Sequence, residues 1–135
     1  MWPVAIDHIG IAVQDLEQAI QTYTQLLGKP AQRESLPERH LEIAFFPLGE
    51  SRVELVSPTS PDSAISNFLQ KRGDGLHHIA YRVEDIEVAL AHARALGWQL
   101  IDEHPRPGPH GALVAFIHPA CLNGVLSEFV AYPER

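Results

Sequence analysis

Four residues of this chain have the types and spacing of a metal site: His8, Glu54, His78 and Glu128. Each glutamate lies among strand-forming apolar residues, where a buried carboxylate is costly unless it is paired. Two imidazole nitrogens and two carboxylate oxygens form a borderline-hard donor set. Such a set suits Zn, Co, Mn, Ni or Fe(II) and leaves positions open for water or substrate. We therefore predict that the four residues bind one divalent cation, without selecting among these metals.

The two histidines occupy equivalent positions of an internal repeat. Residues 8–20 and 78–90 align at an offset of 70, with six identities in thirteen columns. The identical pairs are His8/His78, Ile9/Ile79, Val13/Val83, Asp15/Asp85, Glu17/Glu87 and Ala19/Ala89. His77 aligns instead with Asp7, and adjacent strand residues point to opposite faces. The repeat therefore selects His78, rather than His77, as the partner of His8.

Each copy of the repeat begins with a strand and continues with a helix. Residues 8–13 alternate and are rich in β-branched types, which favours a strand. Asp15 and Asp85 are good N-cap residues before helical periods, and Gly28 and Gly97 follow as C-terminal stops. Further strands are predicted at 31–36, 41–47 and 51–57 in the first half, and at 99–103, 112–118 and 125–132 in the second. The predicted fold is α+β, with two paired βαβββ modules that form a concave mixed sheet around the metal site.

The chain is predicted to be a single domain over residues 1–135. Module one spans 4–57 and module two spans 75–132. Between them lies a linker, 58–74, in which a proline-containing turn precedes a short helix from Ser63 to Arg72 that ends at Gly73.

Composition narrows the class of protein. The hydrophobic fraction of 45% and the charged fraction of 20% are ordinary for a globular protein. The net charge of −7 argues against a nucleic-acid partner. Cys121 is the single cysteine, so no internal disulfide can form and a cytoplasmic location is expected. The N-terminal residues show neither a signal peptide nor a membrane span, so no membrane partner is expected.

The whole chain resembles the vicinal oxygen chelate superfamily, the glyoxalase/bleomycin-resistance/dioxygenase fold. Its hallmarks are paired βαβββ modules and a metal site of two histidines and two acids or glutamines. Within it, the chain is most similar to the methylmalonyl-CoA epimerase family. The matching stretches are Asp7-His-Ile-Gly-Ile-Ala-Val, Pro47-Leu-Gly-Glu, Val53-Glu-Leu-Val-Ser-Pro, the linker and strand over 60–80, Pro107-Gly-Pro-His-Gly and Gly124-Val-Leu-Ser-Glu.

This resemblance implies an isomerase that interconverts (R)- and (S)-methylmalonyl-CoA through α-proton abstraction and a metal-stabilised enolate. It implies the same four metal ligands, an acyl-CoA substrate and a homodimer. Glu38 is the first proton-transfer residue that the family pattern implies, and Glu128 is the candidate for the second. The family has Pro-Glu-(Gln/His)-Gly at this place, whereas this chain has Pro37-Glu-Arg-His.

Three other functions use the same fold. A glyoxalase-I-type lactoylglutathione lyase would share the four ligands, but the linker helix and Glu38 argue against it. A drug-binding or resistance module needs no catalysis and often lacks the ligands, which are all present here. An extradiol dioxygenase generally has two histidines and one carboxylate on iron, so a second acid disfavours it. Metal analysis and assays with methylglyoxal and glutathione distinguish these alternatives.

Overall fold

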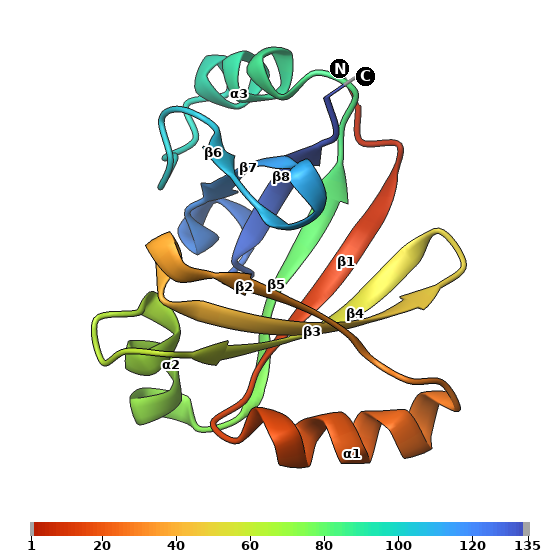
Figure 1. The fold of residues 1–135 in the computed structure, drawn as a ribbon. Coiled ribbons are helices and arrows are strands. Elements are labelled where there is room, and N and C mark those ends of the chain that lie inside the picture. Colours follow the sequence, from red (N-terminus) through yellow and green to blue (C-terminus); the bar gives the residue numbers. More distant parts are fainter. Residues whose placement is uncertain (1, 134–135) are drawn as a thin grey trace. The chain divides into compact units, whose positions relative to one another are not determined.

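The computed structural model describes residues 2–133. These residues form two compact units (Figure 1). We call residues 2–8 and 78–133 the terminal unit, and Ile9–His77 the central unit. The unit boundaries follow His8 and precede His78, so both repeat histidines belong to the terminal unit. The boundaries of the modules and the single domain stay predictions.

The central unit contains an antiparallel sheet and two helices. Its elements are α1 (Leu16–Leu27), β2 (Gln32–Leu36), the 3-10 turn η1 (Pro37–Arg39), β3 (Leu41–Leu48), β4 (Ser51–Pro58) and α2 (Ala64–Arg72). Strand β1 (Ala5–Ala12) enters this unit at Ile9. Strand β3 pairs with β2 on one side and with β4 on the other, and Phe45 lies opposite Glu54.

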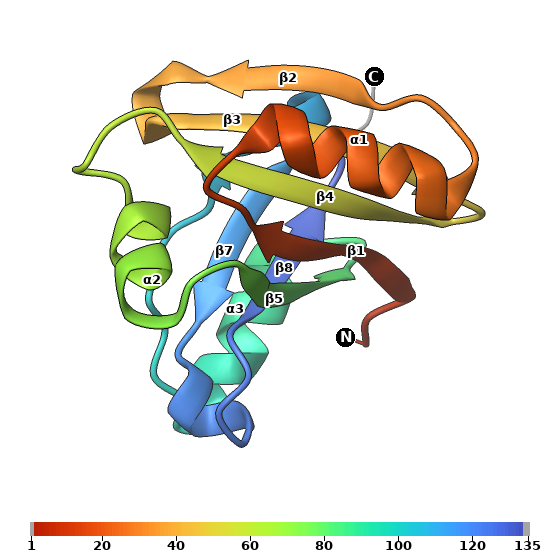
Figure 2. The same ribbon diagram turned by 90° about the horizontal axis from the view of Figure 1, so that it is seen from below.

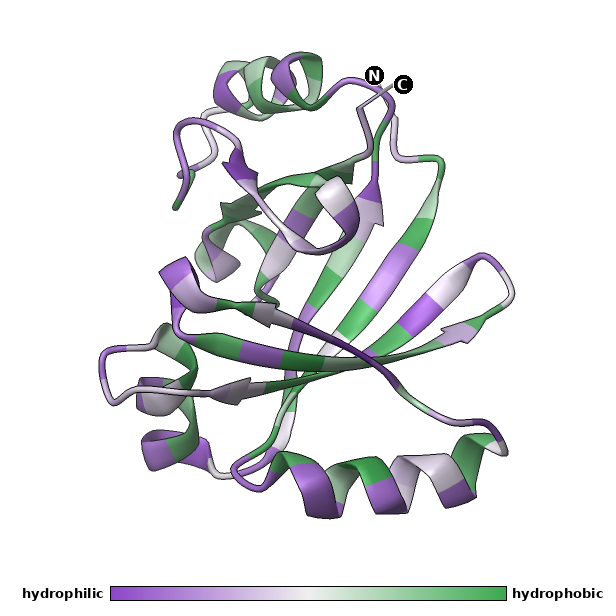
Figure 3. Cartoon of the chain, in the orientation of Figure 1, coloured by the Kyte–Doolittle hydropathy of each residue, from purple (hydrophilic) through white to green (hydrophobic). Residues whose placement is uncertain are grey.

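Helix α1 lies along β3 and β4 (Figure 2). The Asp15 carboxylate caps its first turn by accepting from Gln18 N at 3.1 Å. Apolar residues on one face of the helix then pack on the sheet, where Phe46 and Leu55 have no exposed surface. Hydrophobic and hydrophilic residues alternate along the helix accordingly (Figure 3).

The terminal unit holds the second sheet segment. Its elements are β5 (Gly75–Arg82, from His78 onward), α3 (Ile86–Ala95), β6 (Arg106–Pro107), the 3-10 turns η2 (Pro109–Gly111) and η3 (Pro119–Leu122), β7 (Leu113–Ile117) and β8 (Ser127–Ala131). The strand order is β5-β8-β7-β6. The pair β5 and β8 is parallel, whereas β7 is antiparallel to both β8 and β6.

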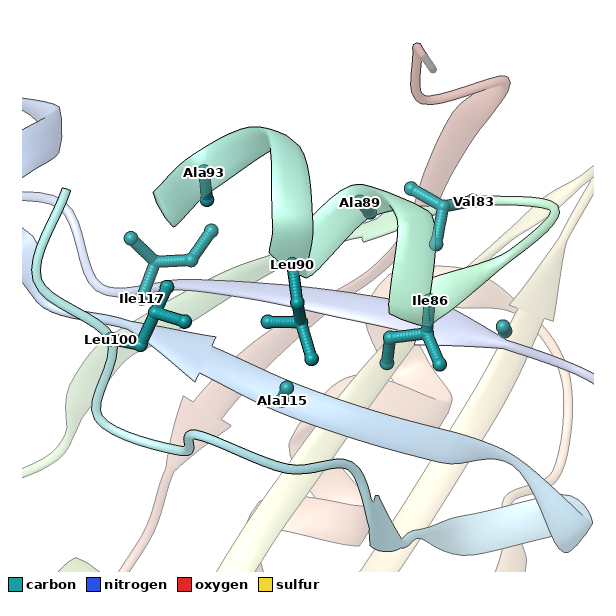
Figure 4. Close-up of a cluster of buried hydrophobic side chains, with 9 residues drawn as sticks. Val83, Ile86, Ala89, Leu90, Ala93, Leu100, Ala115 and Ile117 are labelled. Atoms are coloured by element: carbon teal, nitrogen blue, oxygen red, sulfur yellow. The ribbon is translucent and has the colours of Figure 1, made fainter. Parts of the chain in front are cut away.

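Helix α3 covers one face of this segment. Figure 4 shows Leu90 pointing from the helix toward Ala115 of β7, with Ile86 and Ile117 beside it. All four side chains are buried, and Leu90 and Ala115 have no exposed surface. The helix therefore anchors the strand that supports β8.

The α+β class is confirmed, and each half has the element order βαβββ. The strand predicted at 99–103 is wrong. There Leu100 forms one isolated bridge to Ile117, and the Asp102 side chain accepts from Phe116 N at 2.8 Å in place of a backbone carbonyl. The short strand β6 lies later and ends at a proline, which has no N–H to extend the ladder.

Candidate metal centre

Three side chains of the terminal unit converge on one point. The Nε2 atoms of His8 and His78 are 3.1 Å apart. Glu128 Oε1 lies 3.1 Å from His8 Nε2 and 3.3 Å from His78 Nε2. Each of the three residues is at least 94% buried, with exposed fractions of 4%, 6% and 3%. Within residues 2–133, the side chains of His8, His78 and Glu128 form a group that could hold a metal ion.

The spacing of the three atoms fits a first-row divalent cation. Two ligand atoms about 2.1 Å from one cation are about 3.0–3.4 Å apart when the angle between them is roughly 90–110°. The three measured separations, 3.1, 3.1 and 3.3 Å, fall in that range. In addition, Glu128 Oε1 is buried and makes no hydrogen bond that satisfies the geometry of one. A cation would satisfy that oxygen and both ring nitrogens.

Strand register places the three residues together. Glu128 of β8 lies opposite Ala80 of the parallel strand β5 and opposite Phe116 of β7. His78 precedes Ala80 by two residues on β5, so both share one face. The Phe116 ring packs edge-on against the His78 ring, with centroids 5.3 Å apart. This contact limits rotation of the imidazole.

The electrostatics favour an ionised Glu128. Burial by itself would raise the pKa of this carboxyl group, but its close interactions with the His78 and His8 rings together outweigh burial and lower the pKa to about 2. The carboxylate is therefore available as a metal ligand at neutral pH.

A second layer of contacts orients His8. The carboxylate of Asp7, which has no exposed surface, lies with Oδ2 2.7 Å from His8 Nδ1. Arg82 Nε donates to Asp7 Oδ1 at 3.0 Å, and the Tyr132 hydroxyl donates to the same carboxylate at 2.9 Å. Sequence reasoning missed Asp7, Arg82 and Tyr132. The signal that was available is an acid directly before a predicted histidine ligand.

The fourth predicted ligand, Glu54, belongs to the central unit. It is 2% exposed in the middle of β4, and its Oε2 atom lies 3.6 Å from Arg52 Nε of the same strand. A buried carboxylate on this strand agrees with the expectation from the repeat. Its place in the metal site stays a prediction.

Glu38 also belongs to the central unit, in the turn η1 between β2 and β3. Its side chain is exposed. The turn ends at His40, whose φ of 55° and ψ of 46° lie in the left-handed region. The family pattern has glycine at this position, and glycine adopts that region without steric cost. His40 thus keeps the glycine-like backbone despite its side chain.

His77 and His78 have different surroundings. The His77 ring lies in the central unit, edge-on to Phe68 at a centroid distance of 4.9 Å. The His78 ring lies edge-on to His8 at 5.2 Å. The geometry therefore agrees with the choice of His78 from the repeat.

Comparisons with known proteins agree with this geometry. Residues 7–116 match the glyoxalase/bleomycin resistance protein/dioxygenase superfamily. Human mitochondrial methylmalonyl-CoA epimerase is 37% identical over 125 residues, which cover 91% of this chain and 71% of that protein. The ethylmalonyl-CoA/methylmalonyl-CoA epimerase of Cereibacter sphaeroides is 36% identical over 126 residues, covering 91% and 94%.

A solved structure of an epimerase also has the same fold. A variant of Streptomyces coelicolor methylmalonyl-CoA epimerase in complex with 2-nitronate-propionyl-CoA superposes with a TM-score of 0.92 at 33% identity, covering 97% of this chain and 96% of that one. A lactoylglutathione lyase of Arabidopsis thaliana is more distant, at 27% identity over 114 residues, which cover 82% of this chain and 38% of that protein. Within residues 2–133, the helices are too short or too polar to cross a membrane.

Proposed function

This chain belongs to the glyoxalase/bleomycin resistance protein/dioxygenase superfamily, and we propose that within it the chain is an isomerase that interconverts (R)- and (S)-methylmalonyl-CoA. Its support is the identity of 36–37% to relatives named as epimerases of this class. The observation that carries the proposal is the buried convergence of His8, His78 and Glu128.

We assign these three residues as ligands of a divalent cation, with Glu54 as the fourth ligand that the repeat predicts. When bound, such a cation supplies positive charge that stabilises an enolate oxygen beside the reacting carbon. The protein contributes a dry setting, because all four side chains are at least 94% buried. Burial strengthens each charge interaction in the site. Zn, Co, Ni and Mn all suit this donor set.

Epimerisation also requires a proton to leave one face of the α-carbon and return on the other. Glu38 is the proposed base on one face, and its exposed position between β2 and β3 leaves the carboxylate accessible to a substrate. Glu128 is the proposed partner on the other face. Because its surroundings lower the pKa of Glu128 to about 2, this carboxylate holds a proton weakly.

The alternative to the epimerase function is that of a lactoylglutathione lyase. It would use the same ligands, but the lyase identity of 27% is lower than that of the epimerases. A non-catalytic binding module has no need for three buried ligand atoms within 3.3 Å of one another. These comparisons favour the epimerase.

Exchange of the α-proton of methylmalonyl-CoA with deuterium from D2O tests the function. The purified protein is stripped with a chelator and then reloaded with Co, Zn, Ni or Mn. We expect reloading to raise the exchange rate by at least about 100-fold, since the transition-state charge is then stabilised. The same samples are given methylglyoxal and glutathione. Turnover of that pair without exchange of methylmalonyl-CoA would replace the epimerase by the lyase.

Two further properties stay proposals. A homodimer follows from the family resemblance, and sedimentation of the metal-loaded protein measures it. A cytoplasmic location is proposed because Cys121 is the single cysteine of the sequence, so no internal disulfide can form.

A further inference from the structure

Asp7 is a carboxylate without exposed surface that none of the proton-transfer steps uses. Side chains of His8, Arg82 and Tyr132 contact it. His8 Nδ1 lies 2.7 Å from Oδ2, Arg82 Nε lies 3.0 Å from Oδ1, and the Tyr132 hydroxyl lies 2.9 Å from Oδ1 and 3.0 Å from Oδ2. Arg82 and Asp7 form an ion pair, with Nε 3.0 Å from Oδ1, and a carboxylate in an ion pair offers lone pairs and has no proton to donate. Asp7 therefore acts only as an acceptor.

An acceptor at this position decides which ring nitrogen of His8 carries the proton. Since Asp7 Oδ2 cannot donate, His8 Nδ1 must be protonated to make the 2.7 Å contact. The lone pair of neutral His8 is then on Nε2, the atom that faces His78 and Glu128. The imidazole is thereby prepared for a cation before any cation arrives.

We propose that Asp7 is a positioning residue of the metal centre, and that Arg82 and Tyr132 hold its carboxylate so that His8 presents Nε2 to the cation. This inference rests on the proposed metal site. Asp7 contacts His8 directly, and Arg82 and Tyr132 contact Asp7, so all three act on the site through His8.

The two copies of the repeat differ at the residue that precedes the histidine ligand. The position equivalent to Asp7 in the second copy is His77, which cannot serve as a carboxylate acceptor for His78. The two histidine ligands therefore differ in how they are held. Cation affinity should depend on Asp7 and be insensitive to the side chain at position 77.

The substitution Asp7→Asn tests the proposal with almost no change in the shape of the side chain. Asparagine has one oxygen and one NH2 group, and Arg82 can only donate, so the oxygen must face Arg82. The NH2 group then faces His8 Nδ1 and requires it to accept, which moves the ring proton to Nε2. A ring nitrogen that carries a proton does not bind a cation. The double variant Asp7→Asn/Arg82→Gln frees the asparagine to turn its oxygen toward His8.

Two measurements follow on the intact chain. Nitrogen-15 NMR of histidine-labelled, metal-free protein reads the His8 tautomer, and competition with a chromogenic chelator gives the Kd for Co or Zn. We expect the Nδ1–H form in the wild-type protein, the Nε2–H form in Asp7→Asn, and a rise of Kd by roughly 10- to 100-fold in that variant. The double variant should recover part of the loss. Asp15→Asn is the same substitution at an exposed helix cap and should leave the His8 tautomer and the Kd unchanged.

An Nε2–H tautomer at His8 in the wild-type protein would overturn the proposal, and that reading does not depend on any variant folding. An unchanged Kd in Asp7→Asn would also overturn it, as would a double variant as weak as the single one. If the tautomer and Kd behave as expected while methylmalonyl-CoA shows no proton exchange, the proposed function fails and the role of Asp7 stands.

Discussion

His8 Nε2 lies 3.1 Å from His78 Nε2, although 70 residues separate the two histidines along the chain. Each occupies the same position in its copy of the repeat, and both rings are buried beside the carboxylate of Glu128. The buried Glu128 Oε1 makes no hydrogen bond, and a cation between the three side chains would satisfy this oxygen and accept both ring nitrogens as ligands. The close approach is therefore best explained by a ligand that all three share.

Replacing His78 by alanine should abolish tight cation binding, with Kd for Co rising at least about 100-fold, because one of three converging donors is lost. The matched change His77→Ala removes a ring that packs against Phe68 and should leave Kd within about threefold. Titration of the metal-free proteins with Co, followed by visible absorption, measures both. Equal losses in the two variants would contradict the assignment from the repeat.

Glu38→Gln should keep the metal and slow α-proton exchange by roughly 100- to 10,000-fold, the usual contribution of a general base. The amide has the size of the carboxylate but cannot take a proton at neutral pH. Metal content by mass spectrometry and exchange into D2O are measured on the same sample. Glu50→Gln, at an exposed turn between β3 and β4, is the control and should exchange at the wild-type rate. Wild-type exchange in Glu38→Gln would remove Glu38 from the reaction.

The sequence was informative where structure follows local rules. The sequence predicts Asp15 and Asp85 as caps, and both carboxylates accept from the first turns of their helices. The strands around Glu54 and Glu128 follow from alternation and β-branched residues. The repeat then linked His8 to His78 without any knowledge of distance.

Other features depend on contacts that no local pattern contains. Arg82 and Tyr132 are 75 and 125 residues from Asp7, and only the pairing of strands brings them to it. The strand predicted at 99–103 failed because Asp102 replaces a backbone acceptor with its own side chain. Hydrophobic periodicity does not reveal that a side chain will take the place of a backbone acceptor.

Stability of the metal-free protein should fall in acid because of Glu128. Its folded-state pKa, about 2, is below the ordinary 4.5, so ionised Glu128 stabilises the fold fully above pH 4.5, and this contribution is lost as the pH falls toward 2. By pH 3 the loss amounts to about 2 kcal/mol. Urea unfolding between pH 6 and pH 3 measures it, with Glu128→Gln expected to give a flatter profile. Equal pH profiles for wild type and variant would show that Glu128 has no such role.

Leu90→Ala should lower the free energy of unfolding by about 3 kcal/mol, since a fully buried side chain of α3 leaves a cavity over β7. The matched change Leu96→Ala, at a side chain that is 52% exposed, should cost about 0.5 kcal/mol or less. Thermal unfolding followed by circular dichroism should show a Tm lower by roughly 10 °C for the first variant. Similar Tm values for the two would contradict the packing of α3 against β7.

His40 is expected to tolerate glycine and reject a β-branched residue. Its φ of 55° lies where glycine is unstrained, while glycine loses more backbone entropy on folding, so His40→Gly should change stability by no more than about 1 kcal/mol. Valine at this φ is strained, and His40→Val should cost about 2 kcal/mol. Urea unfolding measures both, with His104→Val as the control at a position without positive φ. Because η1 holds Glu38, His40→Val should also slow α-proton exchange while cation binding is unchanged. A valine variant with wild-type stability and exchange would show that the left-handed turn does not position Glu38.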